Sequence, residues 1–439
     1  MDEQKIFEIL DDWNFWNKEQ DTGVKRKDYL SQIKPFLKTN QAIVLTGVRR
    51  SGKSTILLQL VKELIDSGVN PKDTLIINLE DYRWENLSLQ LLDQIYTFYL
   101  KKINQSRPFY LFLDEIHKII GWERFVRTLI DKKEAKVVVS GSNAKLISQE
   151  LGTLLTGRHV GLKVYPPTFK ELLDLRNLNV NSELDLFRKK TEINNFIDEA
   201  FDYGFFPEII LAEEEKVKLK ILRDGLDSII TRDVAERYKI REKEKIRSLM
   251  RYYLSNTSTS VSFNKLREML NLPLRTIERF SQYLEEAYLI IFLKRFSYKV
   301  KEQEKSPRKV YCIDLGLVNA SGFKFIENKS QLMENLVFLE LTKKEQEVYY
   351  WKNPQQEEVD FVVKDGIKII QLIQVCFNIE NPDTKNRELR SLIKASKELK
   401  CKTLLVITKD YDGEEKIEWF GDKAVIKFIP LWKWLLTSK

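Results

Sequence analysis

Residues 47–54, with the sequence GVRRSGKS, have the spacing G-x-x-x-x-G-K-S. They follow an apolar segment, QAIVLTG, and precede a helix-forming segment, STILLQLVKELIDSG. Between a strand and a helix, the backbone N–H groups of such a loop surround phosphate oxygens, and the start of the helix adds a positive partial charge. The segment therefore predicts a P-loop that binds the phosphates of ATP together with Mg²⁺.

The side chains of this loop have distinct expected roles. Lys53 reaches the β- and γ-phosphates, Ser54 supplies a hydroxyl to Mg²⁺, and Thr55 contacts the α-phosphate. The chain has no Asn-Lys-x-Asp guanine motif, which favours ATP over GTP. The residues expected to bind the nucleotide are Gly47, Arg50, Ser51, Gly52, Lys53, Ser54 and Thr55.

Two acids end a later apolar segment, FYLFLDE. One carboxylate at a strand end can hold the Mg²⁺ water shell, and the other can orient and deprotonate an attacking water. We expect Asp114 to bind the metal and Glu115 to act on the water. The next strand ends in SGSN, where Asn143 is the first choice, and Ser142 the second, for a side chain that positions the water.

Arg158 could stabilise the charge that develops on the γ-phosphoryl group, either in cis or from a neighbouring subunit. The second case would require a homo-oligomer. A plain surface arginine is the equal alternative. His117 and His159 have no metal-ligand spacing and are expected to be solvated or packed.

The order of elements predicts an α/β fold. Short strands alternate with helices in the first 165 residues, which implies a parallel sheet with helices on both faces. Residues 168–240 are expected to be mostly helical, and strands dominate from about residue 310. The expected domains are 1–165, 166–242, 243–308 and 309–439.

Composition adds a charge argument. The net charge is +8 over 439 residues, and residues 241–310 alone contain 16 Lys and Arg against 8 Asp and Glu. A positive field confined to one segment suggests a polyanion site, with DNA the expected partner. No apolar run approaches a membrane span, and three cysteines in no paired spacing indicate neither zinc nor disulfides. We expect a cytoplasmic protein.

Several segments together resemble the prokaryotic AAA-like ATPases often called the archaeal ATPase family. These segments are GVRRSGKST, NLEDYR, LFLDEIHK, VVVSGSN, LLTGRHVGLKVYPPTFKEL, DYGFFPEI, TRDVAERY, MENLVFLEL and EVDFVV. The resemblance implies a P-loop NTPase domain of the additional-strand class, related to the AAA+ and STAND groups. It also implies a winged-helix part and a C-terminal domain like the PD-(D/E)xK nucleases.

The winged-helix prediction falls on residues 262–310. SFNKLREML is similar to a first helix, NLP to the turn, and LRTIERFSQYLEEAYL to a recognition helix, with KEQEKSPRKV in the wing. Basic side chains on such a surface usually contact phosphates. The candidate DNA-binding residues are Arg275, Arg279, Lys294 and Arg295. The alternative is a basic face that is solvated or binds protein.

The nuclease-like resemblance places Glu334, Asp360 and Gln374 around Mg²⁺. The lysine of that pattern is replaced by Cys376, and a neutral thiol cannot supply the missing cation. Lys368 is close in sequence only. We therefore expect a domain that does not cleave DNA.

Three functions follow from these observations. The leading one is an ATP-hydrolysing switch whose nucleotide state controls a DNA-binding winged helix. The first alternative is a DNA nuclease gated by ATP. The second is a STAND-like signalling ATPase that binds protein partners.

Overall fold

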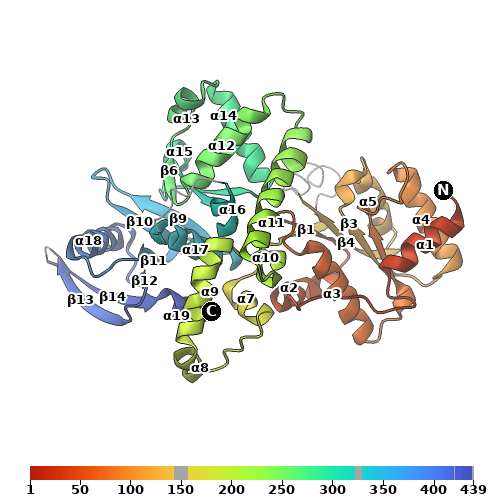
Figure 1. Ribbon diagram of the computed structural model, residues 1–439, viewed down its shortest axis with the longest axis horizontal. Helices are drawn as coiled ribbons and strands as arrows, with labels where there is room; N and C mark the ends of the chain where they lie inside the picture. Colours follow the sequence, from red (N-terminus) through yellow and green to blue (C-terminus); the bar gives the residue numbers. More distant parts are fainter. Residues whose placement is uncertain (143–156, 322–328, 420, 438–439) are drawn as a thin grey trace. The chain divides into compact units, whose positions relative to one another are not determined.

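The computed structural model describes residues 1–142, 157–321, 329–419 and 421–437. The chain forms two compact units, Met1–Tyr165 and Pro166–Lys439, each of mixed α/β structure (Figure 1). Within the described residues, no helix is both long enough and apolar enough for a bilayer span.

A five-stranded, all-parallel sheet organises the first unit, as the sequence predicts. The strand order is β2-β3-β4-β1-β5, so β4 lies between the P-loop strand β1 and the acid-bearing strand β3. Parallel neighbours need crossover connections, which helices supply here. The strands are β1 (Ala42–Thr46), β2 (Thr74–Asn78), β3 (Phe109–Asp114), β4 (Ala135–Gly141) and β5 (His159–Lys163), and the described crossover helices are α3 (Lys53–Asp66), α4 (Leu89–Lys102) and α5 (Trp122–Asp131).

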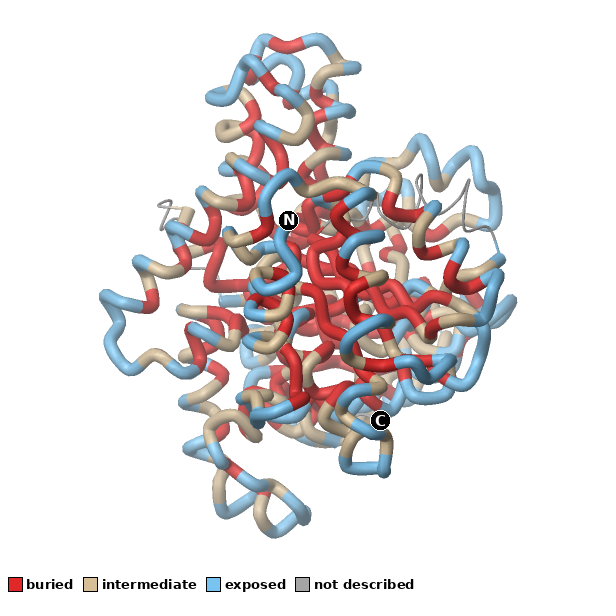
Figure 2. Tube along the Cα trace, turned by 90° about the vertical axis from the view of Figure 1, so that its right-hand side faces the viewer, coloured by how far each residue is buried: buried red, intermediate tan, exposed pale blue. Residues whose placement is uncertain are grey.

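Helices cover both faces of this sheet because side chains alternate along each strand. In β1, Ile43 and Leu45 pack with α2 (Lys27–Leu37) and α3, whereas Val44 packs with α1 (Glu3–Trp13), α4 and α5. In the view of Figure 2, buried residues run along the interior strands and exposed residues lie on the outer surface of the helices. The carboxyl ends of β1, β3 and β4 therefore rest on a core that is filled on both sides.

The segment after α1 protects the edge strand β2. The side-chain amide of Asn14 accepts a hydrogen bond from the N–H of Ile76 (2.7 Å) and donates one to its carbonyl (3.0 Å). The indole N–H of Trp16 donates to the carbonyl of Thr74 at 2.9 Å. These side chains satisfy backbone groups that an open edge would leave exposed.

The second unit begins with helices, as expected for residues 168–240. They are α7 (Phe169–Leu175), α8 (Glu183–Arg188), α9 (Lys190–Tyr203), α10 (Pro207–Leu211), α11 (Glu215–Ser228) and a π-helical segment, Ile229–Glu236. Asp314, just before α16 (Leu315–Ala320), anchors this region because its carboxylate accepts hydrogen bonds from the N–H groups of Phe205 (2.6 Å) and Gly316 (2.9 Å). A Cβ at Gly204 would lie 1.8 Å from that carboxylate, so only glycine fits there.

A small antiparallel sheet with the order β6-β8-β7 follows. The structure differs from the expected wing, because Val300–Lys305, placed in the wing by the sequence, forms a helix, α15. The strand β8 crosses the expected boundary at residue 308. The elements of this region are α12 (Lys243–Ser255), β6 (Thr259–Val261), α13 (Phe263–Leu270), α14 (Leu274–Glu286), β7 (Ile290–Leu293), α15 and β8 (Arg308–Cys312).

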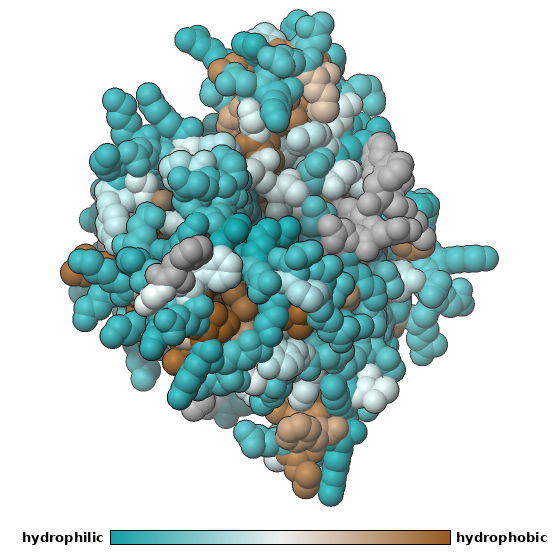
Figure 3. All heavy atoms as spheres, turned by 90° about the vertical axis from the view of Figure 1, so that its left-hand side faces the viewer, coloured by the Kyte–Doolittle hydropathy of each residue, from teal (hydrophilic) through white to brown (hydrophobic). Residues whose placement is uncertain are grey.

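A six-stranded mixed sheet, β13-β14-β12-β11-β10-β9, completes the second unit. Helix α18 packs on it through an apolar core. The sequence analysis did not predict β13, whose residues GEEKIEW are largely charged. The face of the molecule drawn in Figure 3 is mostly hydrophilic. The elements are α17 (Lys329–Lys343), β9 (Glu347–Lys352), β10 (Glu358–Asp365), β11 (Lys368–Cys376), α18 (Pro382–Leu399), β12 (Leu404–Thr408), β13 (Gly413–Trp419), β14 (Asp422–Pro430) and α19 (Leu431–Thr437).

Hydrogen bonds join the small and the large sheet. The N–H of Phe296 donates to the carbonyl of Tyr350 (2.6 Å), and the N–H of Tyr350 donates to the carbonyl of Lys294 (3.1 Å). The buried amide of Asn335 accepts from the N–H of Cys312 (2.8 Å) and donates to its carbonyl (2.9 Å). The two sheets therefore belong to one packed body.

Candidate functional site

The loop between β1 and α3 has the conformation that phosphate binding requires. Arg50 (φ 69°) and Gly52 (φ 92°) lie in the left-handed region. A Cβ at Gly47 would lie 2.0 Å from the carbonyl oxygen of Val164. The backbone at Val164 therefore approaches too closely for any residue other than glycine. No side chain caps the start of α3, which leaves its first N–H groups for an anion.

Lys53 lies inside this loop. Its ammonium donates to the carbonyls of Gly47 and Val48, both at 3.1 Å, and the side chain is only 4% exposed. The hydroxyl of Ser51 is buried and has no hydrogen-bond partner within the described residues. A cation and a hydroxyl donor thus lie where a phosphate would enter the loop.

A serine joins the two acids at the sheet edge. The hydroxyl of Ser140, at the end of β4, donates to the carboxylate of Asp114 and accepts from the N–H of Glu115 at 3.1 Å. Sequence reasoning missed this residue and chose Asn143 and Ser142, which follow it along the chain. Ser142 is buried, and Asn143 lies outside the described residues. The strand order would have indicated Ser140, because β4 lies next to β3 and its last residues therefore lie beside the acids.

Glu115 is held as a general base would need to be. Its backbone is left-handed (φ 53°), an uncommon conformation for a residue with a side chain. Burial raises its pKa to about 7, and this increase outweighs the lowering effect of Lys53, whose ammonium lies 3.9 Å from the carboxylate. The second carboxylate oxygen lies 3.1 Å from Nδ1 of His117. The carboxyl therefore titrates near neutral pH.

Asp114 and Ser54 fit a Mg²⁺ ion. Burial raises the pKa of Asp114, while hydrogen bonds from Ser140 and Ser54 lower it, so the two expected metal ligands are in contact. Both supply oxygen, which Mg²⁺ prefers, and Ser54 is exposed to the solvent that would complete the coordination.

Arg158 does not join this group. It precedes β5, and its backbone carbonyl accepts a hydrogen bond from the N–H of Ala42 at the start of β1 (2.8 Å). Its guanidinium pairs with Asp131 at 2.9 Å. The P-loop follows the opposite end of β1, about 15 Å away at roughly 3.3 Å per residue, so the cis alternative for Arg158 gains no support from this arrangement. A role in trans stays a prediction.

Comparison with known proteins identifies the family. The chain is 35% identical over 408 residues to an uncharacterised protein of Methanocaldococcus jannaschii, covering 91% of this chain and 89% of that protein. It is 31% identical over 363 residues to an uncharacterised protein of Haemophilus influenzae, covering 81% and 87%. Residues 39–173 match the family described as AAA domain. The chain belongs to this family of AAA-like ATPases.

The remainder of the chain matches two further families. Residues 195–327 match a domain of unknown function (DUF8612), and residues 329–434 match another (DUF4143). Among solved structures, the chain is similar to a Walker-type ATPase of Pyrococcus abyssi, with 14% identity, a TM-score of 0.48, and coverage of 70% of this chain and 99% of the other.

A second group of acids lies in the C-terminal part of the chain. Glu334 of α17 and Asp360 of β10 are brought together, as the nuclease-like resemblance implies, but both contact Lys309 of β8, at 2.9 and 3.0 Å. No local sequence signal marks this lysine, because its strand, β8, pairs with β6 and β7 and with no strand that carries the acids. The side-chain amide of Gln374 accepts from the N–H of Asp360 at 3.3 Å and donates to Glu388 of α18 at 2.5 Å.

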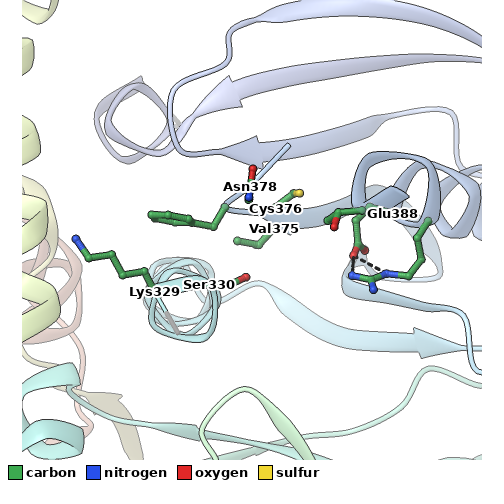
Figure 4. Close-up of a pocket in the computed structure, with 9 residues that line it drawn as sticks. Lys329, Ser330, Val375, Cys376, Asn378 and Glu388 are labelled. Carbon is green, nitrogen blue, oxygen red and sulfur yellow. Dashed lines mark hydrogen bonds and ion pairs between the residues drawn. The ribbon is translucent and has the colours of Figure 1, made fainter. Parts of the chain in front are cut away.

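Cys376 occupies the place of the expected lysine on β11. It is buried, and burial raises the pKa of its thiol to about 11, so the side chain is neutral at physiological pH. It lines a pocket of about 350 Å³ between the start of α17, the end of β11 and α18 (Figure 4). On the α18 side of that pocket, the carboxylate of Glu388 pairs with the guanidinium of Arg387 at 2.6 Å.

The four candidate DNA-binding residues have different surroundings. Arg275 and Arg279 are exposed on α14. The ammonium of Lys294 pairs with Glu304 at 2.6 Å, and the guanidinium of Arg295 donates to the carbonyl of Lys352. Arg295 is therefore committed to the contact between the two sheets, and only the α14 pair presents the expected outward surface.

Proposed function

We propose that this protein binds Mg·ATP at the P-loop and hydrolyses it with Glu115 as the general base. The observation behind the proposal is that Ser140 contacts both Asp114 and Glu115, while Lys53 lies 3.9 Å from Glu115. A nucleotide in the loop would thus meet the cation and the acid pair together. Mg²⁺, held by Ser54 and Asp114, would neutralise phosphate charge.

Each residue of the site then has one role in binding or hydrolysing ATP. The N–H groups at the start of α3 and the ammonium of Lys53 bind the phosphates, which requires the ammonium to leave the carbonyls of Gly47 and Val48. Glu115 accepts the proton of the attacking water. Ser140 keeps the two carboxyl groups in position.

Calorimetric titration with Mg·ATP tests the binding step. Each hydrogen bond to a charged group contributes about 1.5–3 kcal/mol. Lys53→Ala removes the bonds to the β- and γ-phosphates, so it is expected to weaken ATP binding roughly 10²- to 10⁴-fold. Lys62→Ala is the matched control, because Lys62 lies on the same helix and pairs only with acids near the surface, Asp66 and Glu19. Equal affinities for wild type and Lys53→Ala would refute the nucleotide site.

We further propose that α13 and α14 bind duplex DNA. The order helix, strand, two helices and two strands, with β8 central in the sheet, supports a winged helix, although α15 lies between the last two strands. Arg275 and Arg279 are exposed on α14, and Lys265 and Arg267 on α13. Part of the positive charge of residues 241–310 is neutralised inside the protein, since Lys309 pairs with acids of the C-terminal part. The proposal thus depends on these four exposed residues.

The salt dependence of DNA affinity tests this second proposal. Each phosphate contact contributes a slope of about −0.9 in a plot of log affinity against log salt. Arg275→Ala/Arg279→Ala should therefore reduce the slope by roughly 2. Lys397→Ala, a change at an exposed lysine of α18, should leave it unchanged. A protein without salt-dependent DNA binding would instead favour the STAND-like alternative with protein partners.

Nucleotide control of DNA binding is the remaining part of the proposal. We keep 1–165, 166–242, 243–308 and 309–439 as the functional parts, with β8 shared between the last two. If ATP controls the DNA-binding module, DNA affinity will differ between Mg·ATP and Mg·ADP in Glu115→Gln. Equal DNA affinities with Mg·ATP and Mg·ADP would show that the nucleotide does not control DNA binding.

A further inference from the structure

Lys309 is buried among three carboxylates. Its ammonium lies 2.9 Å from Glu334, 2.7 Å from Glu358 and 3.0 Å from Asp360, and its side chain is 3% exposed. An ammonium has three N–H donors. All three therefore have a carboxylate partner, and we call these four residues the Lys309 cluster.

The other polar groups beside the cluster are also committed. The second oxygen of Asp360 accepts from the N–H of Val375 at 2.9 Å, and the Glu334 oxygen that receives Lys309 also accepts from the hydroxyl of Tyr311 at 2.7 Å. The side-chain oxygen of Gln374 accepts from the N–H of Asp360 at 3.3 Å.

These commitments leave no place for the Mg²⁺ that a nuclease-like domain implies. Mg²⁺ needs oxygen ligands in near-octahedral geometry at about 2.0–2.1 Å. Here the ammonium lies between the carboxylates at hydrogen-bond distance, and the amide oxygen expected as a ligand faces a backbone N–H. The residues present do not fit the metal.

We propose that the ammonium of Lys309 takes the place of the divalent ion that the nuclease-like resemblance implies and makes the C-terminal centre a metal-independent, non-cleaving lock. The lock joins β8 of the small sheet to β10 of the large sheet and to helix α17. It is independent of the ATP site, so either proposal can fail without the other.

The competing role for Lys309 is that of the catalytic lysine which β11 lacks. A catalytic lysine must offer an N–H to the scissile phosphate or to the attacking water. The nearly inaccessible ammonium of Lys309 already gives its three N–H groups to carboxylates. A pocket of about 380 Å³ reaches Glu358, Asp360 and Gln374 but is not lined by Lys309.

Binding of Mn²⁺ to the full-length, nucleotide-free protein, followed by electron paramagnetic resonance, tests the proposal. Wild type and Asp360→Asn should bind equal numbers of ions, because no ion uses Asp360. Lys309→Met should gain one ion that Lys309→Met/Asp360→Asn lacks, since three carboxylates are left without their cation. Lys364→Met is the control, because Lys364 lies on β10 with Asp360 but pairs with Glu347 of the neighbouring strand β9 at 2.6 Å, outside the cluster. Its loss should add no ion.

Three results would overturn the proposal. They are a wild-type Mn²⁺ ion that Asp360→Asn loses, a folded Lys309→Met that gains no ion, and nicking of supercoiled plasmid with Mg²⁺ that disappears in Asp360→Asn. If circular dichroism shows that Lys309→Met does not fold, the comparison of wild type with Asp360→Asn still decides.

Discussion

Two buried groups, Glu115 and Lys309, show how surroundings set the chemistry of a single residue. Glu115 has few stabilising contacts, and burial raises its pKa to about 7. Lys309 is also deeply buried, but the carboxylates around it, with Glu334 the largest contributor, raise its pKa and keep it charged. The first group can exchange a proton near neutral pH, whereas the second acts as a fixed charge.

A pH profile of ATP hydrolysis tests the assignment of Glu115. Below its pKa the carboxyl carries a proton and cannot accept another, so kcat/KM should fall as the pH decreases below about 7, by about tenfold per pH unit. The rate should level off above that pH. A profile that is flat between pH 5.5 and 8.5 would contradict a base with this pKa.

At the scale of elements, the sheet order explains the site. Because β4 lies between β1 and β3, its last residues reach the acid pair from the side of the P-loop. Ser140 is the residue whose hydroxyl contacts Asp114 and the backbone of Glu115. The water-positioning role expected for Asn143 remains a prediction.

Ser140→Ala should reduce ATP turnover more than ATP binding. Loss of a side chain that orients a metal ligand typically costs about 10- to 100-fold in activity, while the phosphate contacts of the P-loop stay in place. Steady-state kinetics and calorimetry of the same preparation separate the two effects. A variant with the wild-type kcat would show that the bridge between the acids has no catalytic role.

At the scale of the whole molecule, the sequence was informative wherever a signal is local. The strand–loop–helix around Lys53 and the acids after β3 could be predicted, since each depends on neighbours in the chain. The contact between Lys309 and Asp360 could not, because it joins residues 51 positions apart in strands that do not pair. For a related reason the sequence could not show where Arg158 lies, since the start of β5 is at the end of the sheet opposite the P-loop.

The same limit applies to the basic segment 241–310. Its excess charge was read as a surface for DNA, but Lys309 is buried, and Arg308 and Lys294 share the carboxylate of Glu304. Charge counted along a sequence does not separate exposed from paired side chains. The structure therefore removes Lys309 and Arg295 from the expected surface and leaves the exposed basic side chains of α13 and α14 in it.

The most direct test of the account is a single-turnover experiment with Mg·ATP and Glu115→Gln. The variant should bind ATP with an affinity close to that of wild type, because the P-loop and Asp114 are unchanged. It should release phosphate roughly 10²- to 10⁴-fold more slowly, so that intact ATP can be recovered from the protein. Phosphate release at the wild-type rate would contradict the assignment of the base and, with it, the proposed mechanism.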